Sequence, residues 1–351
     1  MKRLFAFICL FVVAGCNLFE PTYSEGSFPT TVVNLGEVNS AYDDYNSTSH
    51  VVGGVMALVF SSKRGGRTDF DFIHESLNTL FDLKGGKFSF DNHPYGGLDV
   101  VAEQSTLTWA TYVVNTPANE LGPYIRSYEH DLLSADVYSN YNHHGEYMML
   151  FASDRTGNLD IYLTHNYQDS VKSVNGSSSP LSNKNFTAPV SIPFLNSTAD
   201  DAYPTFDQTN SSIYFTSNRD GSFAIYKAPL PTINPNELHR QLPKLTNVAI
   251  ERVSELSSSA DDKCPFISDN TLVFTSNRAG GFGGYDLYYS KWDGSRWSAP
   301  VNFGADINTS YDEYRPILCN LQQFSNQLMI FSSNRPGGKG GFDLYRVGIP
   351  K

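Results

Sequence analysis

Short apolar runs rich in aromatic and β-branched residues recur along the chain, and turns rich in Gly, Asn, Asp and Ser separate them. Such runs predict short strands joined by tight turns. Few stretches are long and amphipathic enough to form a surface helix. We therefore expect an all-β fold.

One of these runs is repeated together with the residues that follow it. The best copies read Thr271-Leu-Val-Phe-Thr-Ser-Asn-Arg278 with Tyr285-Asp-Leu-Tyr288, and Leu328-Met-Ile-Phe-Ser-Ser-Asn-Arg335 with Phe342-Asp-Leu-Tyr345. Weaker copies end at Arg219, Arg155 and Arg64, and the gap of 91 residues between the first two copies has room for one more unit. We place this degenerate sixth unit at residues 107–114, whose apolar and β-branched character suits a strand.

Each unit also has an acidic pair just ahead of an aromatic residue or a proline. From that pair the unit predicts four strands, the second carrying Phe-x-Ser-Asn-Arg, the third Asp-Leu-Tyr, and the outer one resembling residues 297–303. Four antiparallel strands repeated around a channel form the blades of a propeller. The expected fold is a six-bladed β-propeller over residues 30–351, with a divergent second blade.

The two ends of the chain predict how the ring closes. Residues 31–45 align with residues 300–314, which begin with an outer strand, whereas the last unit stops after its third strand. We expect residues 30–36 to pair with residues 342–347 and complete the last blade, because this pairing removes two exposed strand edges.

These phrases resemble the TolB-type, WD-like β-propeller repeat, especially the form found in envelope proteins of Bacteroidota. The resemblance covers the chain from about residue 30 to its end. It implies the propeller fold and says little about function, because such repeats serve in scaffolds, binding modules and some enzymes alike.

The first sixteen residues have the pattern of a lipoprotein signal. Lys2 and Arg3 precede an apolar run of about ten residues, which is too short to span a bilayer as a helix. The Val13-Ala14-Gly15-Cys16 ending resembles the lipobox of bacterial lipoproteins. We expect a signal peptide over residues 1–15, lipidation of Cys16, a tether over residues 16–29, and anchoring at the outer membrane, with the periplasmic face and the cell surface both left open.

The recurring Ser-Asn-Arg with a downstream Asp has the residue types of an active site, but an active site is needed only once. We expect Arg and Asp to face each other across the second and third strands as an architectural pair, with Ser and Asn bonding the turn. This signature comprises Arg64, Arg155, Asp160, Arg219, Arg278, Asp286, Arg335 and Asp343.

The acidic pairs form a ring of carboxylates around the channel mouth if all inner strands begin at one rim. Calcium binds such oxygens, yet Asp ahead of a strand also caps turns, and we expect no metal and no cofactor. His143 and His144 adjoin without the spacing of a metal site. The rim acids are Asp43, Asp44, Asp200, Asp201, Asp261, Asp262, Asp312 and Glu313.

Charge and cysteine content narrow the chemistry further. The formal net charge of −11 disfavours nucleic acid as a partner. Cys264 and Cys319 sit at different offsets within their repeats, which argues against a disulfide between them. Asp169-Ser170-Val171 resembles an O-glycosylation acceptor motif of Bacteroidota, so Ser170 is a candidate for modification.

These features favour a non-catalytic, lipid-anchored subunit that presents the propeller to another envelope protein. Aromatic residues of the divergent blade, Trp109, Tyr112, Tyr124 and Tyr128, are candidates for the partner surface. The alternative is a glycan-binding or polysaccharide-degrading protein of the cell surface, in which rim carboxylates act as acid and base. No Gly-x-Ser-x-Gly elbow supports a peptidase-like site.

Overall fold

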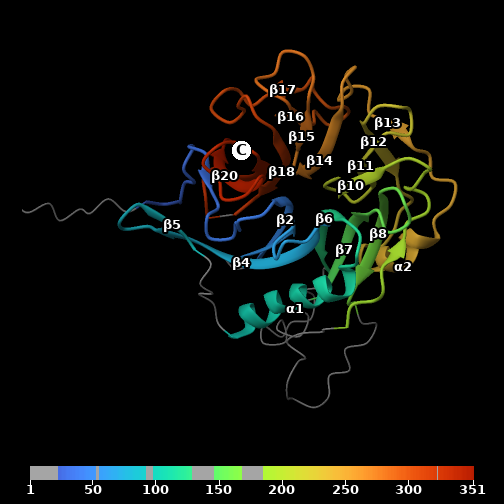
Figure 1. Ribbon diagram of the computed structural model, residues 1–351, viewed down its shortest axis with the longest axis horizontal. Helices are drawn as coiled ribbons and strands as arrows, with labels where there is room; N and C mark the ends of the chain where they lie inside the picture. The colour runs from blue at the N-terminus through green and yellow to red at the C-terminus, as the bar shows by residue number, and fades with distance from the viewer. Residues whose placement is uncertain (1–22, 53–54, 92–97, 129–145, 168–184, 322) are drawn as a thin grey trace, which may run out of the picture.

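The computed structural model describes residues 23–52, 55–91, 98–128, 146–167, 185–321 and 323–351. These residues form five four-stranded antiparallel sheets that stand around a common centre as the blades of a propeller (Figure 1). Among the described residues, no helix combines the length and the apolar character needed to cross a membrane.

In each blade the strands follow one another from the centre of the ring outward. Blade 1 has β2 (Asp44–Val52), β3 (Val55–Ser62), β4 (Asp71–Asp82) and β5 (Lys87–Asp91); blade 2 has β6 (Glu120–Ser127), β7 (Tyr147–Ser153), β8 (Asp160–His165) and β9 (Val190–Ser191). Blade 3 has β10 (Asp201–Phe206), β11 (Ser212–Ser217), β12 (Ala224–Pro229) and β13 (Glu251–Arg252); blade 4 has β14 (Asp262–Ser268), β15 (Thr271–Ser276), β16 (Asp286–Lys291) and β17 (Val301–Asn302). Blade 5 has β18 (Glu313–Cys319), β19 (Gln327–Ser333), β20 (Asp343–Ile349) and β1 (Val33–Asn34).

The ring is closed through its inner strands. The inner strands contact one another in the cyclic order β2, β6, β10, β14 and β18, and β18 lies against β2.

Helix α1 (Leu98–Val114) follows β5, and the short α2 (Leu238–Gln241) lies between the 3-10 turns η2 (Pro235–Glu237) and η3 (Leu242–Lys244) in the connection from β12 to β13. The apolar core fills the spaces between neighbouring sheets.

The expected count of six blades is wrong, because the segment at residues 107–114 is the end of α1 and not a strand. Its buried residues Leu107, Ala110 and Val114 recur at the period of a helix and share one core cluster with Phe72 and Phe151. Packing of this face against blades 1 and 2 overrides the strand preference of the intervening Thr and Val residues.

The predicted ring closure is confirmed. Val33 pairs with Arg346 and Asn34 with Tyr345, so that β1 completes the sheet of β20. The Asn39 side chain then accepts from the Leu344 N–H at 2.9 Å and donates to the Leu344 carbonyl at 2.8 Å. The two ends of the chain thus share one blade.

Every inner strand is interrupted by a β-bulge at an equivalent place. The bulge turns one backbone N–H toward the preceding blade, as where the Cys264 N–H donates to Thr216 Oγ1 at 2.8 Å. At Gly122 a Cβ would lie 2.3 Å from the ring of Tyr203, so only glycine fits there. The bulged residues have left-handed φ values of 55° at Asn46, 57° at Gly122, 56° at Tyr203, 57° at Cys264 and 47° at Arg315.

Deletion of residues 1–34 tests how much the shared blade stabilises the ring. The deletion exposes the edge of β20 and removes Phe28, which is buried and stacks on Phe324 at 3.9 Å between centroids. We expect the free energy of unfolding to fall by at least about 3 kcal/mol, the loss typical of removing a buried Phe side chain. Urea denaturation of this variant and of one that lacks only residues 1–22 measures the difference, and equal stability of the two would refute the closure.

Candidate functional site

Every signature arginine binds the inner strand, and among the described residues Arg64 alone also forms an ion pair with the third strand, at Glu75 (3.2 Å). Arg278 Nη2 lies 2.5 Å from Asp262 Oδ1, and the predicted pairing of Arg278 with Asp286 is therefore wrong, as is its counterpart in the other blades. The arginine Nε also donates to the signature Ser at 2.9–3.1 Å, and every paired carboxylate is fully buried. The equivalent pairs are Arg64 with Asp44 (3.0 Å), Arg155 with Glu120 (3.0 Å), Arg219 with Asp201 (2.6 Å) and Arg335 with Glu313 (2.9 Å).

The other signature carboxylates hold turns. Asp286 accepts the backbone N–H of Phe282 at 2.7 Å and the amide of Asn302 on the outer strand at 2.8 Å. Asp343 accepts the Gly340 N–H and the Asn34 amide, and Asp160 accepts the hydroxyl of Thr156, in the same way.

The first acid of each pair joins neighbouring blades. Asp312, for example, accepts the N–H of Tyr285 in the preceding blade at 2.9 Å. Since both acids of each pair have such partners, the rim carboxylates serve architecture, and within the described ranges no group of His, Cys, Asp and Glu gathers that could hold a metal ion. The other such contacts are Asp43 to Phe342 N–H, Asp200 to Leu159 N–H and Asp261 to Phe223 N–H.

The centre of the ring is filled by side chains. Arg315, which is fully buried, donates to the carbonyls of Pro265 and Pro123 at 3.1 Å and lies over the ring of Tyr203. Burial raises the pKa of the Cys264 thiol to about 12, so this thiol is protonated and a poor nucleophile at neutral pH. Cys264 and Cys319 are both free and buried.

Blade 1 departs from the repeat and leaves a pocket. Its outer strand β5 pairs only with the far half of β4, from Asn78 to Asp82, so α1 covers the first half. Asn115, just after α1, binds the backbone N–H and carbonyl of Phe72 as Asn308 binds those of Leu287 in blade 4. Between β4 and α1 lies a cavity of about 700 Å³, which we call the α1 pocket; it is lined in part by Arg64, Arg67, Asp69, Asp71, His74 and Tyr112.

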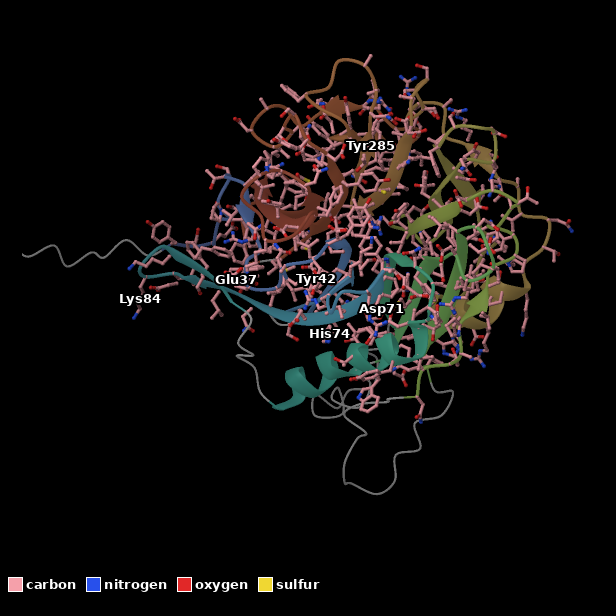
Figure 2. The ribbon with its side chains drawn as sticks, viewed as in Figure 1. Glu37, Tyr42, Asp71, His74, Lys84 and Tyr285 are labelled. Carbon is pink, nitrogen blue, oxygen red and sulfur yellow. The ribbon has the colours of Figure 1, made fainter. Side chains whose placement is uncertain are left out.

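Two polar groups on β4, the buried Asp71 and the half-buried His74, line the α1 pocket, and Figure 2 labels both along β4. Asp71, which is 4% exposed, forms an ion pair with Arg67, and its Oδ1 has no hydrogen-bond partner among the described residues. Burial raises the pKa of Asp71, Arg67 opposes this effect, and the nearby Asp69 adds to it. Asp71 therefore keeps its proton to a higher pH than an ordinary aspartate.

His74 is the second of these groups. Its Nδ1 lies 2.9 Å from Thr108 Oγ1 of α1, and its Nε2 has no partner in the described part of the chain. Burial lowers the pKa of His74 to about 4, so the ring is neutral at pH 7.

An aromatic pair on α1 stands beside the pocket. Tyr112 is 72% exposed and Trp109 is 38% exposed, and their rings lie 5.6 Å apart. Of the four aromatic residues that we expected to form a partner surface, these two are exposed to solvent. Tyr128 is buried, and Tyr124 packs against Phe206. The candidates Cys16, Ser170, His143 and His144 lie outside the described residues.

Comparison with known proteins identifies the fold but no family. No protein-family pattern and no curated protein matches the sequence. An α-L-arabinofuranosidase from Podospora anserina, solved with cellotriose, is 10% identical with a TM-score of 0.47 over 93% of this chain and 98% of its own. An exo-β-1,3-galactanase from Phanerochaete chrysosporium is 13% identical with a TM-score of 0.48 over 92% of this chain and 64% of its own. TolB from Acinetobacter baumannii is 14% identical with a TM-score of 0.34 over 84% of this chain and 51% of its own.

These comparisons support a β-propeller of the TolB-like kind and correct our expectation about function. Several of the similar structures are glycoside hydrolases, and the expectations of a non-catalytic scaffold subunit and of a chain that is not an enzyme are withdrawn. At such low identities the likeness shows the fold alone, so an assignment of activity has to come from the residues of this chain.

The neutral, half-buried His74 makes folding depend on pH. An unfolded His titrates near pH 6.5 and this one near 4, so its contribution to stability is complete above 6.5 and is lost as the pH falls toward 4. As the pH falls from 6.5 to 4, we expect the free energy of unfolding of the wild type to decrease by up to about 3 kcal/mol relative to that of His74→Gln. Thermal or urea denaturation of both proteins checks this, and a stability difference that does not change with pH would exclude the effect. Burial also lowers the pKa of His50, but both proteins contain His50, so its contribution cancels in the difference.

Proposed function

We propose that this protein acts on polysaccharide and takes the glycan into the α1 pocket. The observation that carries the proposal is that Asp71 and His74, each with a buried polar atom (Oδ1 and Nε2) that has no partner among the described residues, line one cavity. A buried polar atom without a partner is costly, and sugar hydroxyls supply donors and acceptors that would satisfy both. The exposed rings of Trp109 and Tyr112 offer apolar faces for the C–H side of a sugar ring.

The pocket also contains the groups needed for glycosidic bond cleavage. Asp71, with its raised pKa, is assigned the role of general acid that donates a proton to the leaving glycosidic oxygen. Asp69 lines the same pocket and is assigned the role of the carboxylate that activates water. Arg64 and Arg67 line the pocket with the two carboxylates and offset their charge, and neutral His74 binds a sugar hydroxyl.

The experiment compares Asp71→Asn with Asp160→Asn, because Asp71 begins β4 as Asp160 begins β8. We expect Asp71→Asn to lower the rate of reducing-end release from neutral oligosaccharides by about 10²–10⁴-fold, since the general acid is lost, while binding changes little. Tyr112→Ala should weaken binding about tenfold, as loss of an aromatic contact does.

Asp160→Asn is the matched control and should keep full activity even where it lowers stability, because Asp160 only holds a turn. Calorimetry with cellotriose, xylotriose and β-1,3-galactotriose measures binding alongside the rates. An equal loss in both Asp variants, or a wild-type protein that neither binds nor cleaves any neutral glycan, would refute the proposal.

The N-terminal pattern supports a proposal about the position of the protein in the cell. We further propose that residues 1–15 are a signal peptide, that Cys16 carries lipid, and that the protein belongs to the lipoproteins of Bacteroidota type anchored at the outer membrane. Such a tether would hold the α1 pocket close to envelope or extracellular glycans.

Intact-mass measurement of the protein purified from native membranes tests these modifications. We expect a mass that lacks residues 1–15 and includes acyl chains on Cys16, with a glycan on Ser170 as a further mass increment. A Cys16→Ser variant should retain the signal or leave the membrane fraction. Membrane-bound, lipid-free protein would rule out the anchor.

A further inference from the structure

A second cavity lies between blades 3 and 4, and we call it the blade 3–4 groove. Its volume is about 520 Å³, and it shares no residue with the α1 pocket. It is formed by the turn from β10 to β11, the turn from β14 to β15, and the hairpin that joins β16 to β17. These connections lie at the ends of the strands away from the signature arginines, so the repeat architecture does not use them.

The groove has a rigid aromatic wall. Trp292 and Trp297 are joined by an antiparallel backbone bridge, and their rings lie 5.2 Å apart. Trp297 Nε1 donates to the hydroxyl of Tyr214 in blade 3 at 3.2 Å, and both of these side chains are buried. Trp292 is only half-buried, so one aromatic surface of this fixed cluster remains available to a ligand.

Polar groups surround that wall, and turns fix two of them in place. Asp293 Oδ1 accepts the N–H groups of Ser295 and Arg296, which lower the pKa of Asp293 to about 2 and keep it ionised. In blade 3, Asp207 accepts the N–H and the hydroxyl of Ser211 within the turn from β10 to β11. Asp269 and Lys227 also line the groove, and Arg296 lies 3.6 Å from Asp293, so three carboxylates stand against two basic side chains.

We propose that the blade 3–4 groove is a separate binding site for an oligosaccharide that carries no acidic groups. Preorganised carboxylates accept sugar hydroxyls, Lys227 donates, and the Trp292 face packs on the apolar side of a pyranose ring. The excess of negative charge repels uronic acids and sulfated sugars and so favours a neutral chain. For the class of ligand alone, the proposal rests on the action on polysaccharide inferred above.

The tryptophans allow the groove to be observed on its own. The sequence has three Trp residues, one beside the α1 pocket and two in the groove, so in Trp109→Phe all tryptophan emission comes from Trp292 and Trp297. This variant is titrated with cellohexaose, xylohexaose, laminarihexaose and, as the acidic probe, hexagalacturonic acid. We expect at least one neutral hexasaccharide to change the emission saturably and hexagalacturonic acid to have no effect at the same concentration.

Adding Trp292→Ala should weaken that binding about tenfold or more, read from the emission of Trp297. Phe282→Ala is the matched control, because Phe282 is an exposed aromatic residue of the same blade, 48% exposed, that does not line the groove. Unchanged binding in the Trp292 variant, an equal loss in the Phe282 variant, or binding of hexagalacturonic acid as tight as that of the neutral sugars would each overturn the proposal.

The outcomes separate this inference from the proposed function. Binding in the groove by a protein that cleaves no glycan supports the groove and refutes the assigned catalysis. Cleavage that depends on Asp71, with no emission change in Trp109→Phe, refutes the groove and leaves the catalytic assignment standing. Absence of both binding and cleavage refutes both proposals.

Discussion

The whole propeller depends on one repeated contact, a buried carboxylate held by the arginine of the Ser-Asn-Arg signature. In blade 4, Asp262 is the first residue of the inner strand, and Arg278 lies in the turn after the second strand and donates to the Asp262 carboxylate. The same guanidinium donates to the carbonyl of Leu256 and lies 5.0–5.1 Å from the rings of Phe274 and Tyr288. A buried ion without its partner is strongly destabilising, so each blade has to bring its inner strand, turn and preceding loop together at one point. The recurring Phe and Tyr residues are therefore explained by the arginine that they enclose.

This contact also decides where chemistry can occur. The acids that begin the inner strands are fully buried against arginine, and the first acids of the pairs bind the backbone of the neighbouring blade. Aromatic rings and Arg315 close the centre. The repeated polar groups of a regular blade are thus engaged in the architecture, and a ligand site has to come from a departure from the repeat. The helix in blade 1 and the tryptophan hairpin in blade 4 are two such departures.

Much of the fold can be predicted from the sequence, because the repeat is local and each copy reports the same strands. Ring closure could be predicted because residues 31–45 repeat residues 300–314. The partner of Arg278 could not be predicted, because Asp262 and Asp286 both lie near Arg278 along the chain, one before it and one after it. The helix was missed because Thr and Val residues separate Leu107, Ala110 and Val114 and hide their helical spacing. With the helix unrecognised, nothing in the sequence brought Thr108 or Tyr112 next to His74, and the α1 pocket could not be foreseen.

The availability of Asp71 follows from comparison with its counterparts in the regular blades. Asp286 and Asp343 each accept backbone N–H groups from a glycine-rich turn and an amide from the outer strand. In blade 1 the outer strand is displaced to the far end of β4, so within the described ranges no outer-strand amide reaches Asp71. Arg67, which is itself largely exposed, is left as its ionic partner, while Arg64 binds Asp44 and Glu75. The displacement of the outer strand by the helix therefore leaves one oxygen of Asp71, a residue that lines the α1 pocket, without a partner among the described residues. A ligand that donates to this oxygen would remove the cost of burying it unpaired.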